Sequence, residues 1–379
     1  MNENLALDTI SNLLEWEKDD LDKSEFEWLK LLSQFKYDNY EGYEPGSRFF
    51  TSLIGWLKQF ADIQDRKTAY DFLKNHLIFF SRQEIIHLVY RLWPLAQREI
   101  INAVAEQEGI PQWEVMSKAK MKYDIHLRQS LFVGLSDGAK MDVFRRDNEG
   151  TISNEQTLVA YEISKKKWTS ICNELKTEIG KKGWSVAPVF KHVFLIDDFT
   201  ASGTTLIRFD KVKNEWNGKI KSFMEHILEA ELKVLDDNCH IHVHHYVGTA
   251  TSEKKVKKRI HDFKGYLASI LNEADGKQKY PNLRFTASFG LVLDKKFYIS
   301  KKSCPDFAKL IAQHYDKSIQ TVTTGCVKFG YKRGRLGVVF EHNTPNNSVG
   351  LIWAETTEKN VPLTTSPMAP LFRRRARHL

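Results

Sequence analysis

A short apolar run that ends in two adjacent acidic residues constrains the fold of this 379-residue chain more than any other feature. Residues 193–196 read Val-Phe-Leu-Ile, and Asp197 and Asp198 follow directly. A continuous apolar run of this length is typical of a central strand in a parallel sheet, because helices cover both faces of such a strand. The two acids then stand where the strand is expected to end.

Other apolar runs of similar length surround this one, and helical patterns separate them. We expect further strands at residues 131–135, 158–161, 241–247 and 285–292, with a helix over residues 168–179. Strands that alternate with helices predict an α/β fold with a parallel sheet.

The first third of the chain has a different pattern, in which apolar residues recur at spacings of three and four. This periodicity predicts an all-α domain over residues 1–125. The α/β domain, with a C-terminal extension, is then expected over residues 126–379.

Composition indicates the cellular location of the protein and the charge of its ligands. The formal charge of +8 favours anionic ligands, and the four cysteines are scattered without a close pair, as in reduced cytosolic proteins. The acidic N-terminus does not resemble a signal peptide, and no apolar run approaches the ~18 residues of a membrane span. We therefore expect a cytoplasmic protein with no membrane partner.

A loop of small and hydroxyl-bearing side chains follows the two acids. Its backbone N–H groups suit an anion, and Gly203 lets a ligand approach the backbone closely. A helix is expected to begin near Leu206, where its dipole would favour a phosphate. The expected phosphate-binding residues are Thr200, Ala201, Ser202, Gly203, Thr204 and Thr205.

Residues 197–205, Asp-Asp-Phe-Thr-Ala-Ser-Gly-Thr-Thr, resemble the phosphoribosyl-pyrophosphate signature of the type I phosphoribosyltransferases. The resemblance covers about residues 128–300 and implies a parallel sheet of the phosphoribosyltransferase type. It also implies that Asp197 and Asp198 hold the ribose hydroxyls while the loop holds the 5′-phosphate. The alternative interpretation is an ordinary strand, turn and helix with capping Asp and Thr side chains.

A second turn follows the apolar run at residues 131–135. In the family that the chain resembles, the loop at this place grips the pyrophosphate. A simple turn explains this segment equally well by itself, but two phosphate-type loops in this order support each other. The expected residues are Ser136, Asp137, Gly138 and Ala139.

The resemblance implies that a nitrogen nucleophile replaces pyrophosphate on C1 of the ribose. Mg²⁺ would stabilise the leaving diphosphate, and Asp197 and Asp198 are the expected catalytic and metal-binding residues. Two positions depart from the family pattern. Ala201 occupies the place of an acid that serves some members as general base, and Asp137 stands where a basic residue would better suit a diphosphate.

The C-terminal part, including Asn-Thr-Pro-Asn-Asn at residues 343–347, resembles a divergent bacterial branch of this family. That branch belongs to conflict and antiphage systems, some encoded beside retron reverse transcriptases. The resemblance implies a toxin-type effector that acts on phosphoribosyl pyrophosphate or a nucleotide, by glycosyl transfer or base removal. A reverse transcriptase with its RNA or DNA is an implied partner; a plain polar turn explains residues 343–347 equally well.

The rival hypothesis is a non-catalytic sensor that binds a nucleotide and contacts a protein or ribonucleoprotein through its helical domain. Ala201 and Asp137 favour the sensor, and the acid pair favours the enzyme. The basic runs at residues 254–259 and 373–377 add nucleic acid as a third class of partner, although such runs are usually solvated.

His240, His242 and His244 alternate along an expected strand and would share one face of it, with His245 on the other. Metal ligation by histidines of one strand needs a further ligand from elsewhere, so a polar strand face is the favoured interpretation. The lysines at residues 165–167 fit a solvated helix start at least as well as a mobile cover over the ligand.

Overall fold

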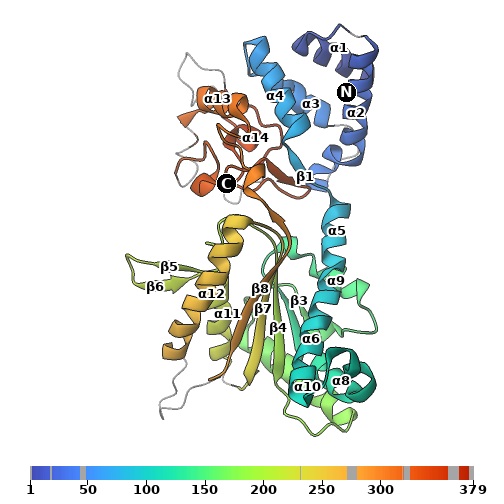
Figure 1. Ribbon diagram of the computed structural model, residues 1–379, viewed down its shortest axis with the longest axis vertical. Coiled ribbons are helices and arrows are strands. Elements are labelled where there is room, and N and C mark those ends of the chain that lie inside the picture. Colours follow the sequence, from blue (N-terminus) through green and yellow to red (C-terminus); the bar gives the residue numbers. More distant parts are fainter. Residues whose placement is uncertain are drawn as a thin grey trace. The chain divides into compact units, whose positions relative to one another are not determined.

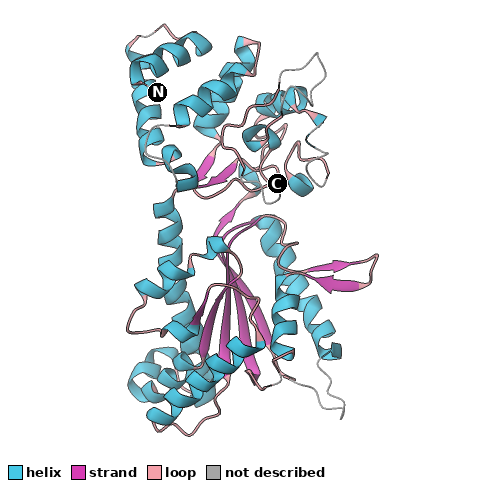
Figure 2. Cartoon of the chain, turned by 180° about the vertical axis from the view of Figure 1, so that it is seen from behind, coloured by secondary structure: helices cyan, strands magenta, loops and turns pink. Residues whose placement is uncertain are grey.

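The computed structural model divides the chain into two compact units, one formed by residues 1–85 with 294–379 and the other by residues 86–293 (Figure 1). It describes residues 2–17, 19–42, 48–230, 232–270, 280–317, 319, 325–356 and 367–374. Figure 2 shows the distribution of helices and strands from the opposite side. Among these described residues, no helix is both long enough and apolar enough to cross a bilayer.

The first unit is mainly helical and includes both ends of the sequence. Its core joins aromatic side chains that lie far apart in the chain: Phe72 stacks on Phe307 with ring centroids 3.8 Å apart, and Phe372 lies against Phe49 and Phe79. Its elements are α1 (Glu3–Leu14), α2 (Asp20–Phe35), α3 (Phe49–Lys58), α4 (Ile63–Asn75), β1 (Ile78–Phe80), β9 (Val338–Phe340), α13 (Pro305–His314) and α14 (Gly350–Trp353), with β1 and β9 paired in parallel.

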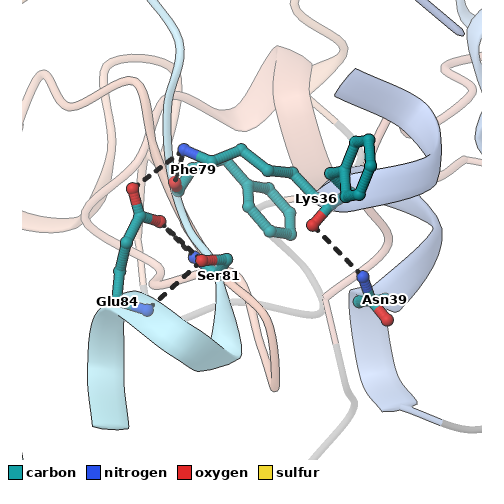
Figure 3. A network of polar contacts seen from close by, with 6 residues as sticks. Lys36, Asn39, Phe79, Ser81 and Glu84 are labelled. Carbon is teal, nitrogen blue, oxygen red and sulfur yellow. Dashed lines mark hydrogen bonds and ion pairs between the residues drawn. The ribbon is translucent and has the colours of Figure 1, made fainter. Parts of the chain in front are cut away.

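A capping network begins the helix α5 (Arg82–Tyr90) and ties it to α2 (Figure 3). The Glu84 carboxylate accepts hydrogen bonds from the backbone N–H and the hydroxyl of Ser81, and the Glu84 N–H donates back to that hydroxyl. Lys36 completes the network with an ion pair to Glu84 at 2.9 Å and a hydrogen bond to the Phe79 carbonyl. This reciprocal Ser-x-x-Glu arrangement satisfies the free donors of a helix start.

The compact units differ from the division expected at residue 125. The separation falls inside α5, and the helices that follow it belong to the second unit. The C-terminal residues do not extend the α/β unit, because their apolar side chains complete the core of the N-terminal helices. Local periodicity identified the helices but could not show which core each one joins.

The second unit contains a parallel five-stranded sheet in the order β3-β2-β4-β7-β8, in agreement with the expected α/β class. One face of the sheet is apolar and is covered by helices whose largest buried side chains are Trp168, Phe223 and Phe263. The strands are β3 (Thr157–Leu158), β2 (Ser130–Gly134), β4 (Phe190–Thr200), β7 (Leu235–Thr249) and β8 (Arg284–Leu293), and the helices are α6 (Leu92–Glu108), α7 (Val115–Lys118), α8 (Lys120–Arg128), α9 (Met141–Asp147), α10 (Lys165–Lys181), α11 (Lys219–Leu228) and α12 (Ala250–Ile270).

The helix expected near Leu206 is absent from this place, so that prediction was wrong. The loop is followed instead by an antiparallel hairpin of β5 (Arg208–Asp210) and β6 (Glu215–Asn217), and a helix begins only at Lys219. Phe209 contacts Trp216 across the hairpin, and Asn214 takes a positive φ of 52° in its turn. This cross-strand aromatic pair stabilises a hairpin that the apolar pattern of residues 206–209 concealed.

Candidate functional site

The acid pair projects beyond the end of β2 at the carboxyl edge of the sheet. The pairing of β2 with β4 ends where Gly134 lies beside Ile196. The next residue, Leu135, donates its N–H to the Ile196 carbonyl. Asp197 and Asp198 therefore emerge past β2, although β4 continues to pair with β7. The carboxyl edge of a parallel sheet is where α/β proteins bind ligands.

The structure brings the upstream turn directly onto these acids. The Ser136 hydroxyl lies 2.5 Å from Asp197 Oδ1 and 3.2 Å from Asp198 Oδ1. Gly138 lies so close to Asp198 that a β-carbon on it would fall 2.2 Å from Asp198 Oδ2. The Ala139 carbonyl accepts a hydrogen bond from the buried Tyr246 hydroxyl. The two segments, distant in sequence, thus form one polar site, while Asp137 remains exposed at its rim.

Lys219 completes the site, and the sequence reasoning missed it. Its Nζ lies 2.7 Å from Asp197 Oδ2, and both side chains are largely buried. Burial raises the pKa of Asp197 to about 6, with a further rise caused by the Asp198 charge, while Lys219 and the Ser136 hydroxyl act in the opposite direction. The lysine stands 22 residues after its partner, at the start of α11, so no local motif reveals it.

The small-residue loop has the compact form expected of an anion-binding turn. Gly203 takes a φ of +66°, and a β-carbon there would fall 2.7 Å from Val256. Both the backbone conformation and the close contact therefore favour glycine at this position. The Thr200 hydroxyl accepts the Gly203 N–H, and the hydroxyls of Ser202 and Thr204 lie 2.8 Å apart. Thr205 is exposed at the end of the turn.

Side chains from the end of β7 and from α12 hold three loop carbonyls. Ser252 donates to the Thr200 carbonyl, Thr249 to the Ala201 carbonyl and Arg259 to the Ser202 carbonyl. These hydrogen bonds hold the loop backbone in place against the end of β7 and the start of α12. Because no helix follows the loop directly, a phosphate there would depend on backbone N–H groups, hydroxyls and nearby cations, without the expected helix dipole.

His240, His242 and His244 lie on the face of the sheet opposite the apolar one, where they form a continuous series of hydrogen bonds with side chains of β8. Thr286 bridges His240 and His242, and Ser288 bridges His242 and His244, at 2.6–2.8 Å. Burial is the main cause that lowers the pKa of His240 to about 3, of His242 to about 4 and of His244 to about 3. These rings are therefore neutral at pH 7.

A metal at this face would need Glu99, whose carboxylate lies within 4.8 Å of ligand atoms of His240 and His242. The Arg284 guanidinium, however, lies 3.2 Å from His240 Nδ1, and guanidinium groups only donate, so that nitrogen accepts. Each ring nitrogen of both histidines thus has a partner within the protein. The polar strand face, rather than a metal centre, is the better account of these residues.

The structure places the remaining sequence candidates on other elements. Lys165 begins α10 after its N-cap residue Ser164. In the run at residues 254–259 the four lysines are exposed on α12, whereas Val256 is buried and Arg259 is half-buried. Thr344 is buried in the first unit, where its hydroxyl donates to the Phe372 carbonyl. In the basic tail, Arg373 pairs with Glu355, whereas residues 375–377 lie outside the described residues.

These features define a class: an α/β protein whose parallel sheet carries an acid pair, a small-residue loop and a second polar turn at one edge. The model of the PRTase-CE family matches residues 53–374, and the chain belongs to this phosphoribosyltransferase-like family. The match includes parts of both compact units, beyond the residues 128–300 of the expected resemblance. No curated protein and no solved structure matches the chain.

Proposed function

We propose that the edge formed by residues 136–139 and 197–205 binds phosphoribosyl pyrophosphate or a nucleotide, and that the protein acts there by glycosyl transfer or base removal. The single observation that supports this best is the contact of Ser136 with Asp197, because it joins the two loops at one edge of the sheet. Ribose hydroxyls would meet the acids, the 5′-phosphate would meet the loop after β4, and a diphosphate would meet the turn after β2.

The donor set suits Mg²⁺. Asp197, Asp198 and Ser136 offer hard oxygen atoms close together, and such oxygens, with substrate phosphates, are the usual ligands of this ion. Bound Mg²⁺ would stabilise negative charge on a leaving diphosphate. The chain's own residues would orient the ribose and anchor its phosphate, so that remote binding energy positions C1.

In transfer, the bond from C1 to the diphosphate oxygen breaks, a bond from C1 to a nitrogen nucleophile forms, and pyrophosphate leaves. In base removal, the bond from C1 to the base nitrogen breaks, a bond from C1 to a water oxygen forms, and the free base leaves with a proton from that water. Ala201 offers no general base to the loop. The acid pair, whose Asp197 has a pKa raised to about 6 chiefly by burial, is the better source of proton transfer at this edge.

Calorimetry with phosphoribosyl pyrophosphate and Mg²⁺, followed by mass spectrometry of the same mixture with cell nucleotides, tests both binding and chemistry. The double variant Asp197→Asn with Asp198→Asn should lose both. A matched control is Asp236→Asn with Asp237→Asn, another adjacent acid pair at the amino end of β7. If the first double variant keeps full activity, this assignment is wrong.

The second candidate function is a non-catalytic nucleotide sensor that engages a protein or ribonucleoprotein. The exposed Asp137 at the diphosphate end and the lack of an acid at Ala201 favour it. Saturable binding without any product in the mass spectrum would support the sensor over the enzyme.

The cellular setting that we propose is the bacterial cytoplasm, in an antiphage system with a retron reverse transcriptase and its RNA or DNA as partner. Co-purification of the full chain with such a ribonucleoprotein tests the partner. A phage challenge with the Asp197→Asn, Asp198→Asn variant tests whether defence requires the site. Salt-dependent retention on single-stranded nucleic acid tests direct contact by the basic surface.

A further inference from the structure

One long edge of the five-stranded sheet has no neighbouring strand among the described residues. β8 pairs with β7 along one side only, and Figure 1 shows it at the margin of the sheet beside α12. Alternate residues of such a strand direct backbone N–H and C=O groups away from the paired neighbour. This edge can therefore accept a further strand.

The sequence of β8 lacks the features that usually protect an edge strand. After Arg284 it reads Phe-Thr-Ala-Ser-Phe-Gly-Leu-Val-Leu, with no charged residue and no proline. Residues 285–290 are only half-buried, and Leu291 is exposed. An edge of this length and composition pairs readily with other extended segments.

A groove of about 430 Å³ runs beside the first half of this strand. Its apolar lining residues are buried or half-buried and form the floor, whereas its lysines and arginine are exposed and form the rim. None of the described residues that line it is acidic. At this rim Lys257 has an ion pair with Glu253, and Arg284 has one with Glu106, but exposed pairs of this kind contribute little and are easily exchanged. The lining residues are Arg284, Phe285, Thr286, Ala287, Lys257, Ile260, His261 and Lys264.

We propose that β8 and this groove bind an extended, acidic segment of a partner protein, which adds to the sheet as a sixth strand. The strand edge supplies backbone hydrogen bonds, the apolar floor accepts alternate side chains, and the basic rim selects acidic ones. A second copy of this chain is a poorer occupant, because each copy carries a net charge of +8 and presents basic residues at this groove.

Fluorescence anisotropy with the full chain tests the proposal, using a labelled peptide of about ten residues that alternates glutamate and valine. Saturable binding is expected. The charge reversal Lys257→Glu with Lys264→Glu should weaken it by about tenfold or more. The reversal Lys254→Glu with Lys255→Glu is the matched control, since these exposed lysines lie on the same helix outside the groove, and it should change binding little.

The backbone contribution needs its own control. A peptide that alternates glutamate and proline has the same charge but lacks half of the N–H donors, so it should bind far more weakly. Amide hydrogen exchange should slow along residues 284–291 when the first peptide binds, and not when the second is added.

Four outcomes would overturn the proposal. They are no saturable binding of the glutamate-valine peptide up to ~1 mM, equal binding of both peptides, tighter groove-dependent binding of an oligo-dT strand, and a dimer of the free chain that the Lys257, Lys264 reversal dissolves. The last two would assign the surface to nucleic acid or to self-association instead.

Discussion

Lys219 holds Asp197 in an ion pair of 2.7 Å at the point where the proposed ligand would meet the acid pair. A cation that approached Asp197 Oδ2 would have to displace this ammonium group. The protein thus carries an internal counter-ion for its most buried site carboxylate, and ligand binding and the Lys219 position are coupled.

We predict that Lys219→Met lowers the free energy of unfolding at pH 8 by roughly 3–5 kcal/mol, because it leaves a buried carboxylate beside a second acid. At pH 5 the loss should be smaller, since Asp197, whose pKa is raised to about 6 mainly by burial, can then take up a proton. Urea unfolding at the two pH values measures this difference.

In the same variant, 10 mM Mg²⁺ should restore more stability than in the natural protein, because the ion meets no competing ammonium group. Lys221→Met, which removes the half-buried Lys221–Glu225 pair from the same helix, serves as control. Equal stabilisation by Mg²⁺ in all three proteins would contradict the idea that the lysine and a cation share Asp197.

Gly138→Ala should weaken binding of phosphoribosyl pyrophosphate by at least about tenfold while the protein remains folded. The added methyl group would fall 2.2 Å from Asp198 Oδ2, so either the acid or the turn must move. Titration calorimetry measures the affinity. Gly180→Ala on α10 is the control, because nothing lies within 4 Å of its β-carbon position; unchanged affinity in Gly138→Ala would show that the turn does not shape the site.

The amino-acid sequence was sufficient to predict the strands that depend on short apolar runs. The run of four apolar residues predicted a covered strand, and the structure confirms it. The expectation that this strand ends at the acids was wrong, because β4 continues to Thr200 beside β7; the acids pass only the end of β2. The expected positions of the β7 and β8 strands also agree with the structure. By contrast, at residues 158–161 only Leu158 joins a strand.

Local sequence patterns could not predict contacts between residues that lie far apart in the chain. Lys219 reaches Asp197 only because the β5–β6 hairpin separates the loop from α11, and the hairpin itself depends on the contact of Phe209 with Trp216. Likewise, the stacking of Phe72 on Phe307 joins segments far apart in the chain, and no periodicity within either segment encodes that pairing.

The buried histidines predict a strong loss of stability in acid. Burial is the first cause that lowers the pKa of each of five rings to about 3 or 4, whereas an unfolded histidine titrates near ~6.5. Below that pH the unfolded chain binds more protons than the native one, so stability is present above pH ~6.5 and is lost as pH falls. These residues are His126, His240, His242, His244 and His245.

Each such histidine contributes a slope of up to about 1.4 kcal/mol per pH unit in this window. Asp197 acts in the opposite direction, because its raised native pKa favours the folded state at low pH, but it is one group against five. Chemical unfolding at pH 8, 6.5 and 5 should therefore show the largest loss between the last two. His242→Gln should reduce the slope, and His87→Gln, an exposed position, should not; a slope near zero in the natural protein would refute this account.

His245 should respond to substitution in the opposite way from its neighbours. It is fully buried on the same face as Asp197, stacks on Phe289, and neither ring nitrogen has a hydrogen-bond partner among the described residues. An unsatisfied buried polar group costs roughly 1–3 kcal/mol, so His245→Leu should raise the free energy of unfolding by a similar amount.

His240→Leu is the contrasting variant, because it removes a ring that is bonded to Thr286 and Arg284, and it should lower the free energy of unfolding. Urea denaturation at pH 7.5 compares the two. If His245→Leu is as destabilising as His240→Leu, then the His245 ring is satisfied in solution by water or by a ligand of the adjacent acid pair. A parallel loss of affinity for phosphoribosyl pyrophosphate in His245→Leu would identify the ligand as that partner, whereas unchanged affinity would leave water.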